Sequence, residues 1–132
     1  MKPTNCNRDT PKFSFAGRQM LGKCVYVVDG DTIDVSVKIP VVPESIEIIK
    51  GDGKYSVLRL RILGINTPEI RGASRPEGLV SKKFVEDLIL DKMVAIECGQ
   101  FDNFGRVLAH VYTLNNMADI LLENNLAVRY MV

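Results

Sequence analysis

Three short segments of this 132-residue chain contain the residue types that cleavage of a phosphate diester requires. They are residues 29–32, 61–69 and 102–106. Between them they supply oxygen ligands for a divalent cation, a glutamate that can act as a base, and arginine side chains. A protein that cuts a phosphodiester must hold such a cation and neutralise the charge on the phosphoryl oxygens. Taken one at a time, each segment is also typical of an ordinary turn or strand.

The first segment combines a turn with an acidic residue that faces inward. Asp29 and Gly30 form a common hairpin dipeptide, so a plain turn is the simplest interpretation. Asp31, however, continues the alternation of Ile33 and Val35 and is therefore expected to face the core. Because a carboxylate in that position needs a partner or a metal ion, we predict that Asp31 is a ligand of a hard cation.

The second segment places an arginine next to a rigid, acidic loop. Arg61 is expected on the opposite strand face from Leu60 and Ile62, and Glu69 follows Pro68 in the loop that this strand enters. The alternative is a solvated arginine and a strand ended by proline. An arginine can bind two phosphate oxygens at once, and a glutamate can orient or deprotonate a water molecule. The pair therefore predicts phosphate binding and base catalysis on one surface.

The third segment again has a simple and a functional interpretation. Residues 102–105 are typical of a turn between strands, and Arg106 then begins the next strand. In the functional interpretation this second guanidinium stabilises a five-coordinate phosphorus transition state. Arg59 is expected to be a surface or ion-paired residue, His110 a packed or surface residue rather than a catalytic base, and Tyr130 a packing residue rather than a recognition residue.

The elements that must position these segments follow from apolar periodicity. Alternation predicts strands over residues 22–28, 33–39 and 55–65, and two further strands near 93–96 and 106–113. Residues 40–54 are expected to form an extended hairpin arm. Val80, Phe84 and Leu88 recur every four residues and predict an amphipathic helix, while residues 72–76 before it are expected to be a loop. A second helix is expected over 117–124, with Asn125 as its left-handed cap.

This order of elements predicts an α+β fold that is mainly β. Five short strands with a helix after the third are typical of a small Greek-key barrel of the OB type with two helices. Residues 1–18 are polar and interrupted by prolines, so we expect a flexible N-terminal tail followed by one domain over 19–132.

The composition excludes several classes of protein. Hydrophobic residues make up 46% and charged residues 25%, an ordinary globular balance. No apolar run reaches the roughly 20 residues that span a bilayer, and no signal peptide is recognisable. Three cysteines without C-x-x-C spacing predict structural thiols rather than disulfides or a zinc site. We therefore expect an intracellular, cytoplasmic monomer that does not bind membranes.

The charge balance bears on the kind of nucleic-acid contact. A net charge of +1 is low for a protein that coats long stretches of nucleic acid. A small local site with a few arginines is expected instead, which suits a cleaving enzyme better than a coating protein.

The joint order of D-G-D-T, R-x-x-G-I-x-T-P-E and D-x-x-G-R resembles the thermonuclease family, the staphylococcal nuclease-like domains, over about residues 22–127. The resemblance implies an OB-type barrel with a calcium-dependent site that hydrolyses DNA or RNA on the 5′ side of the phosphodiester and leaves 3′-phosphate ends. It also implies that Arg61 and Arg106 bind phosphate and stabilise the transition state, and that Glu69 is the general base or positions the water.

The same resemblance implies a set of metal ligands. Asp31 becomes a side-chain calcium ligand and Thr67 a ligand through its backbone carbonyl, with Asp29 in an outer shell. Asn66 stands where the family has a second metal-binding aspartate, so one formal charge is lost and other divalent cations become possible. Phe104 replaces a tyrosine of the family and keeps a ring face for stacking on a base.

The expected function is a calcium-dependent nuclease acting on DNA, RNA or both, by endo or exo cleavage. Asn66 and the near-neutral charge leave a second interpretation open. This is a weakly active or inactive module that binds nucleic acid or a protein partner. A third is an accessory domain whose site is a relic.

Overall fold

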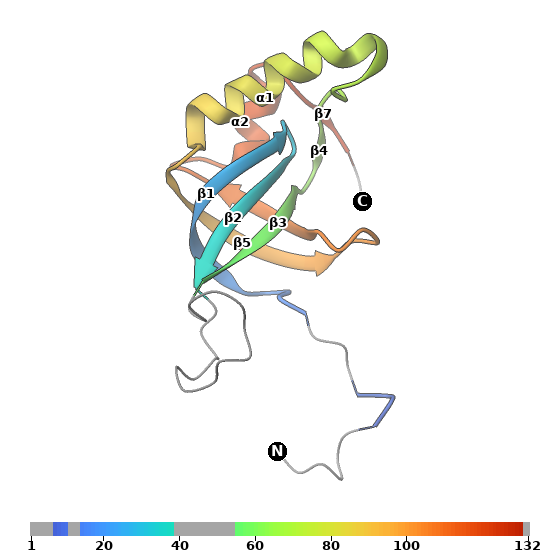
Figure 1. Cartoon of the computed structure of the whole chain (residues 1–132), viewed down its shortest axis with the longest axis vertical. Helices are drawn as coiled ribbons and strands as arrows, with labels where there is room; N and C mark the ends of the chain where they lie inside the picture. Colours follow the sequence, from blue (N-terminus) through green and yellow to red (C-terminus); the bar gives the residue numbers. More distant parts are fainter. Residues whose placement is uncertain (1–6, 11–13, 39–54, 131–132) are drawn as a thin grey trace.

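Five strands close into a barrel, as the sequence predicted, and their order is β1–β2–β3–β6–β5 (Figure 1). The computed structural model describes residues 7–10, 14–38 and 55–130. The barrel strands are β1 (Gln19–Asp29), β2 (Thr32–Lys38), β3 (Tyr55–Ile62), β5 (Met93–Phe101) and β6 (Val107–Tyr112). The expected hairpin arm over 40–54 lies outside the described residues.

Strands β1, β2 and β3 pair in sequence order, and β5 and β6 complete the barrel through one parallel contact. β2 pairs antiparallel with β1 and β3, and β5 pairs antiparallel with β1 and β6. The pairing of β3 with β6 is parallel, with Leu60 opposite Val107, and it closes the barrel. Ile33, Val35 and Val37 are fully buried, so the alternation seen in the sequence places β2 correctly.

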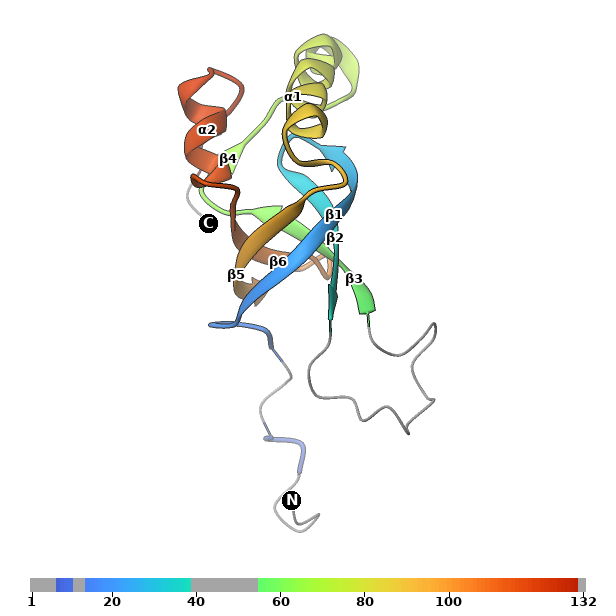
Figure 2. The same ribbon diagram turned by 90° about the vertical axis from the view of Figure 1, so that its left-hand side faces the viewer.

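Two helices cover one end of the barrel (Figure 2). They are α1 (Arg75–Ile89), which follows the short 3-10 helix η2 (Gly72–Ser74), and α2 (Met117–Glu123). Helix α1 therefore begins inside the segment that the sequence predicted as a loop. Pro76 is compatible with this start, because the first turn of a helix needs no amide hydrogen from it.

The buried face of α1 differs from the predicted one. Gly78, Ser81, Val85 and Ile89 face the barrel, whereas Val80 is 58% exposed. The predicted row of Val80, Phe84 and Leu88 is therefore wrong as the centre of the buried face. Phe84 and Leu88 are half-buried at the edge of the buried face. Small residues let the helix approach the barrel closely, and a search for apolar side chains overlooks them.

The C-terminal part of the chain returns to the barrel after α2. Asn125 has a φ of 57°, so the predicted left-handed cap is confirmed. Leu126 donates its N–H to the Leu121 carbonyl, 2.9 Å away, and closes the end of the helix. Strand β7 (Val128–Arg129) then pairs antiparallel with β4 (Ile65–Asn66), the short strand that follows β3.

The segment before β1 also contributes to the core. Phe15 is buried although it lies in the region expected to be a flexible tail, and its ring centroid is 5.8 Å from that of Phe101. Cys24 and Cys98 are buried free thiols, as expected, while Cys6 lies outside the described residues. Among the helices that the structure describes, none has the length and apolarity needed to traverse a bilayer.

Candidate active site

The three predicted segments meet around one cavity of about 470 Å³. The turn after β1, the β4 strand with its following loop, and the loop between β5 and β6 form its walls. All six residues that the sequence singled out line this cavity: Asp31, Arg61, Asn66, Thr67, Glu69 and Arg106. The remaining lining residues are Asp29, Pro68, Asp102, Asn103, Phe104, Leu108 and Tyr130.

The register of β3 directs Arg61 into the cavity. In the sheet Arg61 is opposite Thr32 of β2 and Leu108 of β6. Its neighbours Leu60 and Ile62 are buried in the core, so the strand alternation turns Arg61 to the other face. Its side chain is only 11% exposed.

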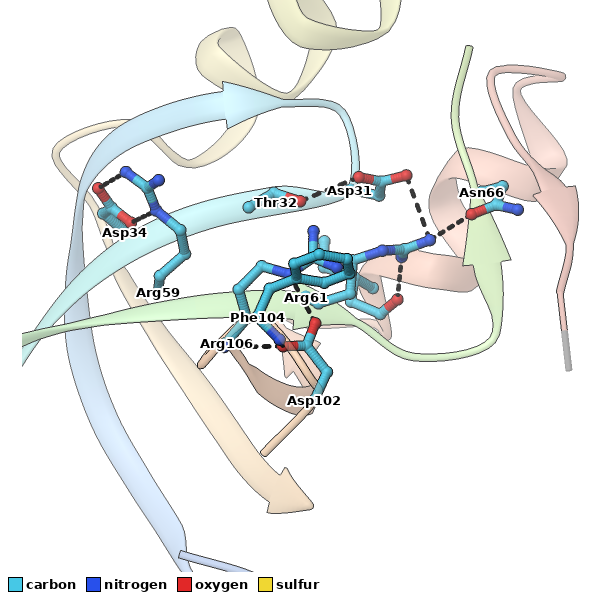
Figure 3. Close-up of polar contacts among 10 residues, drawn as sticks. Asp31, Thr32, Asp34, Arg59, Arg61, Asn66, Asp102, Phe104 and Arg106 are labelled. Atoms are coloured by element: carbon cyan, nitrogen blue, oxygen red, sulfur yellow. Dashed lines mark hydrogen bonds and ion pairs between the residues drawn. The ribbon is translucent and has the colours of Figure 1, made fainter. Parts of the chain in front are cut away.

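The guanidinium of Arg61 donates hydrogen bonds to a backbone oxygen and to a side-chain oxygen of nearby residues (Figure 3). Nη1 donates to the Ile62 carbonyl at 2.7 Å, and Nη2 donates to Asn66 Oδ1. The same Nη2 lies 3.4 Å from Asp31 Oδ2. Its Cζ is 6.0 Å from the centroid of the Tyr130 ring. These contacts fix a positive charge at one wall of the cavity.

Asp31 is a buried and well-partnered carboxylate. It accepts the Thr67 N–H at 3.0 Å and the Thr32 hydroxyl at 3.1 Å. Burial alone raises the pKa of Asp31, but hydrogen bonds from Asp29 and Thr67, together with the Arg61 charge, hold that pKa below its usual value. Burial and the Asp31 carboxylate raise the pKa of Asp29 to about 6. Asp31 therefore loses its proton at a lower pH than Asp29.

A glycine allows this acidic turn to contact the rest of the site. A Cβ on Gly30 would lie 2.8 Å from both the Ser81 Cβ of α1 and the Thr67 Cγ2. Any larger residue would push the turn away from the helix and from Thr67. The Asp-Gly dipeptide therefore has a packing role in addition to its role in the turn.

The donor set fits a hard divalent cation in its chemistry. Asp29, Asp31 and Asn66 supply carboxylate and amide oxygens, which are the ligands that calcium prefers. Thr67 Oγ1 is buried without a hydrogen-bond partner among the described residues, so it is an unused oxygen at the same place. Two features weaken the set. No group of three or more acidic, His or Cys residues suited to a metal occurs in the described part of the chain, and the Asn66 oxygen contacts Arg61.

Glu69 lies at the exposed edge of the cavity. Its side chain is 67% exposed, and its Oε2 accepts a hydrogen bond from Arg71 Nε at 2.8 Å. This contact lowers the pKa of Glu69, so the carboxylate is in its basic form at neutral pH. Ser74 donates to the Glu69 carbonyl at 2.8 Å and fixes the loop. Sequence reasoning did not identify Arg71 as a partner.

Arg106 enters the cavity from the loop between β5 and β6. Its Nε donates to Asp102 Oδ2 at 2.6 Å, and its Cζ lies 5.4 Å from the centroid of the Phe104 ring. The Phe104 side chain is almost fully exposed at the cavity mouth. The loop therefore presents a guanidinium and an aromatic face side by side.

Two cavity residues were missed from the sequence. Tyr130 was expected to pack, but it is 46% exposed and lines the cavity. Its position depends on the β4–β7 pairing and on its N–H bond to the Gly64 carbonyl, which no local pattern reveals. Asp102 was noted only as part of a turn. The spacing of four residues between Asp102 and Arg106 could have indicated that the two side chains form an ion pair.

Two residues that the sequence did not assign to the site lie outside the cavity. Arg59 is ion-paired with Asp34 through contacts of 2.8 and 3.0 Å and does not line the cavity, so that prediction is confirmed. His110 lies on β6 away from the cavity lining, and its Nδ1 is buried without a hydrogen-bond partner among the described residues.

Comparison with known proteins gives a consistent result. The chain is 32% identical over 108 residues to the protein named Endonuclease Htp3 of Saprolegnia parasitica, a match that covers 79% of this chain and 51% of the relative. It is 30% identical over 96 residues to an uncharacterized endonuclease of Escherichia coli, covering 73% and 50%. An uncharacterized protein of Methanocaldococcus jannaschii is 28% identical over 132 residues, covering 83% and 56%. The chain thus spans about half the length of these curated relatives.

A family model described as staphylococcal nuclease homologue matches residues 59–132. This match covers more than half of the chain and includes Arg61, Glu69 and Arg106. On these grounds the chain belongs to the staphylococcal nuclease homologue family.

Proposed function

We propose that this chain is a nuclease that hydrolyses phosphodiester bonds of DNA, RNA or both, with a divalent cation as cofactor. One observation carries the proposal: Arg61 and Glu69 of one segment and Arg106 of a distant one line a single cavity together with the ionised Asp31 of a third segment. Two of the similar proteins are named endonucleases, which supports the same activity.

In this proposal the six cavity residues singled out from the sequence have defined tasks. Arg61 and Arg106 bind the phosphate and stabilise the charge that develops on its oxygens. Glu69, exposed and in its basic form, orients or deprotonates the attacking water. Asp31, Thr67 and, less strongly, Asn66 hold the cation, with calcium as the first candidate. A divalent cation bound there would supply a Lewis acid for the phosphoryl group. By family resemblance, cleavage on the 5′ side leaves 3′-phosphate ends.

The test is a cleavage assay on fluorescently labelled single-stranded DNA and RNA. We expect cleavage in calcium, with the rates in magnesium and manganese measured in parallel, and none in excess chelator. The D34N variant is the matched control, because it alters an acidic partner of an arginine outside the cavity. Wild-type protein that is folded yet cleaves neither polymer with any of the three cations would contradict the proposal.

A second candidate is a binding module without turnover. The contact between Asn66 Oδ1 and Arg61 favours it, because that oxygen is occupied by a guanidinium in the present arrangement. This alternative expects oligonucleotide binding that is the same in calcium and in chelator, and no saturable heat of calcium binding by titration calorimetry. Chelator-sensitive cleavage would exclude it.

A further inference from the structure

One carboxylate organises the whole loop that carries Arg106. Asp102 Oδ1 accepts the backbone N–H groups of Phe104 at 2.8 Å and of Arg106 at 2.9 Å. Asp102 Oδ2 accepts Arg106 Nε at 2.6 Å. The Asp102 N–H also donates to the Arg106 carbonyl at 2.8 Å, and Gly105 donates to the Asp102 carbonyl at 3.2 Å. The side chain of Asp102 thus binds both the backbone and the guanidinium of the same residue.

This arrangement leaves a particular edge of the guanidinium available. Nε of Arg106 is engaged by Asp102, whereas Nη1 and Nη2 have no hydrogen bond to any described residue. The Phe104 ring near Cζ covers part of the guanidinium plane. The side chain is 29% exposed and lines the cavity. A guanidinium held by Nε and by a ring face presents its two terminal nitrogens as a fork for two phosphate oxygens.

We propose that Asp102 is a positioning residue that fixes the Arg106 guanidinium so that its two terminal nitrogens bind the substrate phosphate. The inference rests on the proposed function and adds a residue to which neither the sequence motifs nor the comparisons give a role. Asp102 does not itself contact the phosphate, because a second carboxylate there would repel it. It acts through Arg106 alone.

A second arginine–carboxylate pair in the same barrel provides an internal control. Arg59 Nε donates to Asp34 at 2.8 Å and Arg59 Nη2 donates to the same carboxylate at 3.0 Å, and this pair lies apart from the cavity (Figure 3). In both pairs the carboxylate side chain is 14% exposed. D34N and D102N each remove the charge of an equally exposed carboxylate that accepts an arginine Nε, and only D102N is expected to affect the site.

The decisive experiment is a double-mutant cycle on cleavage, with thermal unfolding of each variant. D102N keeps an oxygen for the backbone N–H groups but loses the acceptor for Arg106 Nε. We expect kcat/KM to fall about 10- to 100-fold in D102N, which is the range for a displaced or unsupported active-site group. D102N and R106A should lower kcat and raise KM in the same proportion, because both act on the same guanidinium. In the R106A background D102N should have no further effect, because its target is absent.

The outcomes separate this inference from the proposed function. If the wild type cleaves and D102N cleaves equally well, or D102N lowers the rate just as much in the R106A background, the positioning role is overturned and the nuclease stands. If the wild type does not cleave, binding of a labelled single-stranded hexanucleotide in chelator is measured by fluorescence anisotropy on the same variants. Weaker binding in D102N, absent from the R106A background, supports the positioning role although the nuclease proposal fails. Equal binding, or no binding by the wild type, overturns it.

A spectroscopic measurement covers the case in which D102N does not fold. In the wild-type NMR spectrum, the Nε–Hε signal of Arg106 is assigned by its loss in R106K. We expect slow exchange with water and the shift of a strongly hydrogen-bonded group. The exchange rate and shift of a solvent-exposed arginine would overturn the proposal.

Discussion

The two arginines of the cavity are held by different edges of their guanidinium groups. Arg61 uses both terminal nitrogens for Ile62 and Asn66, whereas Arg106 uses Nε for Asp102. Arg61 therefore has two tasks, since it also neutralises the neighbouring acidic turn. A lysine at position 61 can provide the charge but cannot contact these oxygens and a phosphate at once.

For this reason we expect R61K to fold but to cleave poorly. Removing one hydrogen-bond donor that stabilises the charged oxygens of a transition state lowers kcat by about 100- to 1000-fold. The measurement is kcat and KM on a short labelled oligonucleotide, with R59K as the matched control because Arg59 lies outside the cavity. A rate for R61K within a few-fold of the wild type would show that charge alone is sufficient.

Glu69 is expected to behave differently, because it contributes little to the fold. Its one ion pair among the described residues, with Arg71, lies on an exposed surface where such pairs contribute little to stability. E69Q should therefore lower kcat by about 100-fold or more, the usual contribution of a general base, and leave the melting temperature unchanged. Steady-state kinetics and differential scanning fluorimetry measure the two effects. An unchanged kcat would remove Glu69 from the mechanism.

At the scale of elements, helix α1 sets the position of the loop that carries Glu69. A Cβ on Gly78 would lie 2.7 Å from the Glu69 carbonyl oxygen and 2.8 Å from that of Pro68. These are backbone atoms, so the loop or the helix would have to move. The close approach of the helix therefore positions Glu69, the proposed general base, and also stabilises the fold.

G78A tests this contact. Alanine is intrinsically better than glycine in a helix by about 1 kcal/mol, so a helix without the contact would become more stable. We expect the reverse, a loss of about 1–3 kcal/mol from overpacking, together with reduced kcat because Glu69 is displaced. Urea unfolding and cleavage assays measure both, with the exposed Glu77 of the same helix changed to alanine as the control. A stabilised and fully active G78A would contradict the assignment.

The loop between β5 and β6 is expected to lose its stabilising contact in acid. Burial tends to raise the pKa of Asp102, but hydrogen bonds from Arg106 and Phe104 hold it below its usual value of about 3.9. A lowered pKa stabilises the fold at every pH above the usual value, and this contribution disappears as the pH falls through the folded-state pKa. The wild type should therefore exceed D102N in unfolding free energy at pH 5 to 7, and the difference should shrink toward pH 2.5. Urea unfolding across that range measures it, and a constant difference would be inconsistent with the contact.

At the scale of the whole molecule, the two described cysteines report on the integrity of the core. Both are buried, and burial raises the pKa of Cys24 to about 11 and also raises that of Cys98. Because the thiolate is the reactive form, neither should react with a thiol reagent in the native protein at pH 8. In a C6S background we expect two labelled thiols in urea and none in buffer. Rapid labelling in buffer would indicate a looser core.

The sequence predicted the barrel well because strand alternation is a local property. It predicted the contents of the cavity from motif order, although the pairings that bring Arg61 and Arg106 to one place are not local. It failed where the fold relies on small or distant residues. The buried face of α1 is built on Gly78 and Ser81, and Tyr130 reaches the cavity through a strand of two residues. Hydrophobic periodicity contains no signal for either.

The parallel contact between β3 and β6 has a consequence for when the chain becomes active. Arg61 precedes Ile62 at the end of β3 and Arg106 stands directly before β6, so these strands must pair before both guanidiniums share one space. Pairings between segments distant along the chain form late in folding, because loop closure has to be paid for first. A full-length chain in which β3 and β6 are not yet paired therefore contains both arginines without bringing them together. If the proposed function holds, cleavage should begin only after β3 and β6 have paired and closed the barrel.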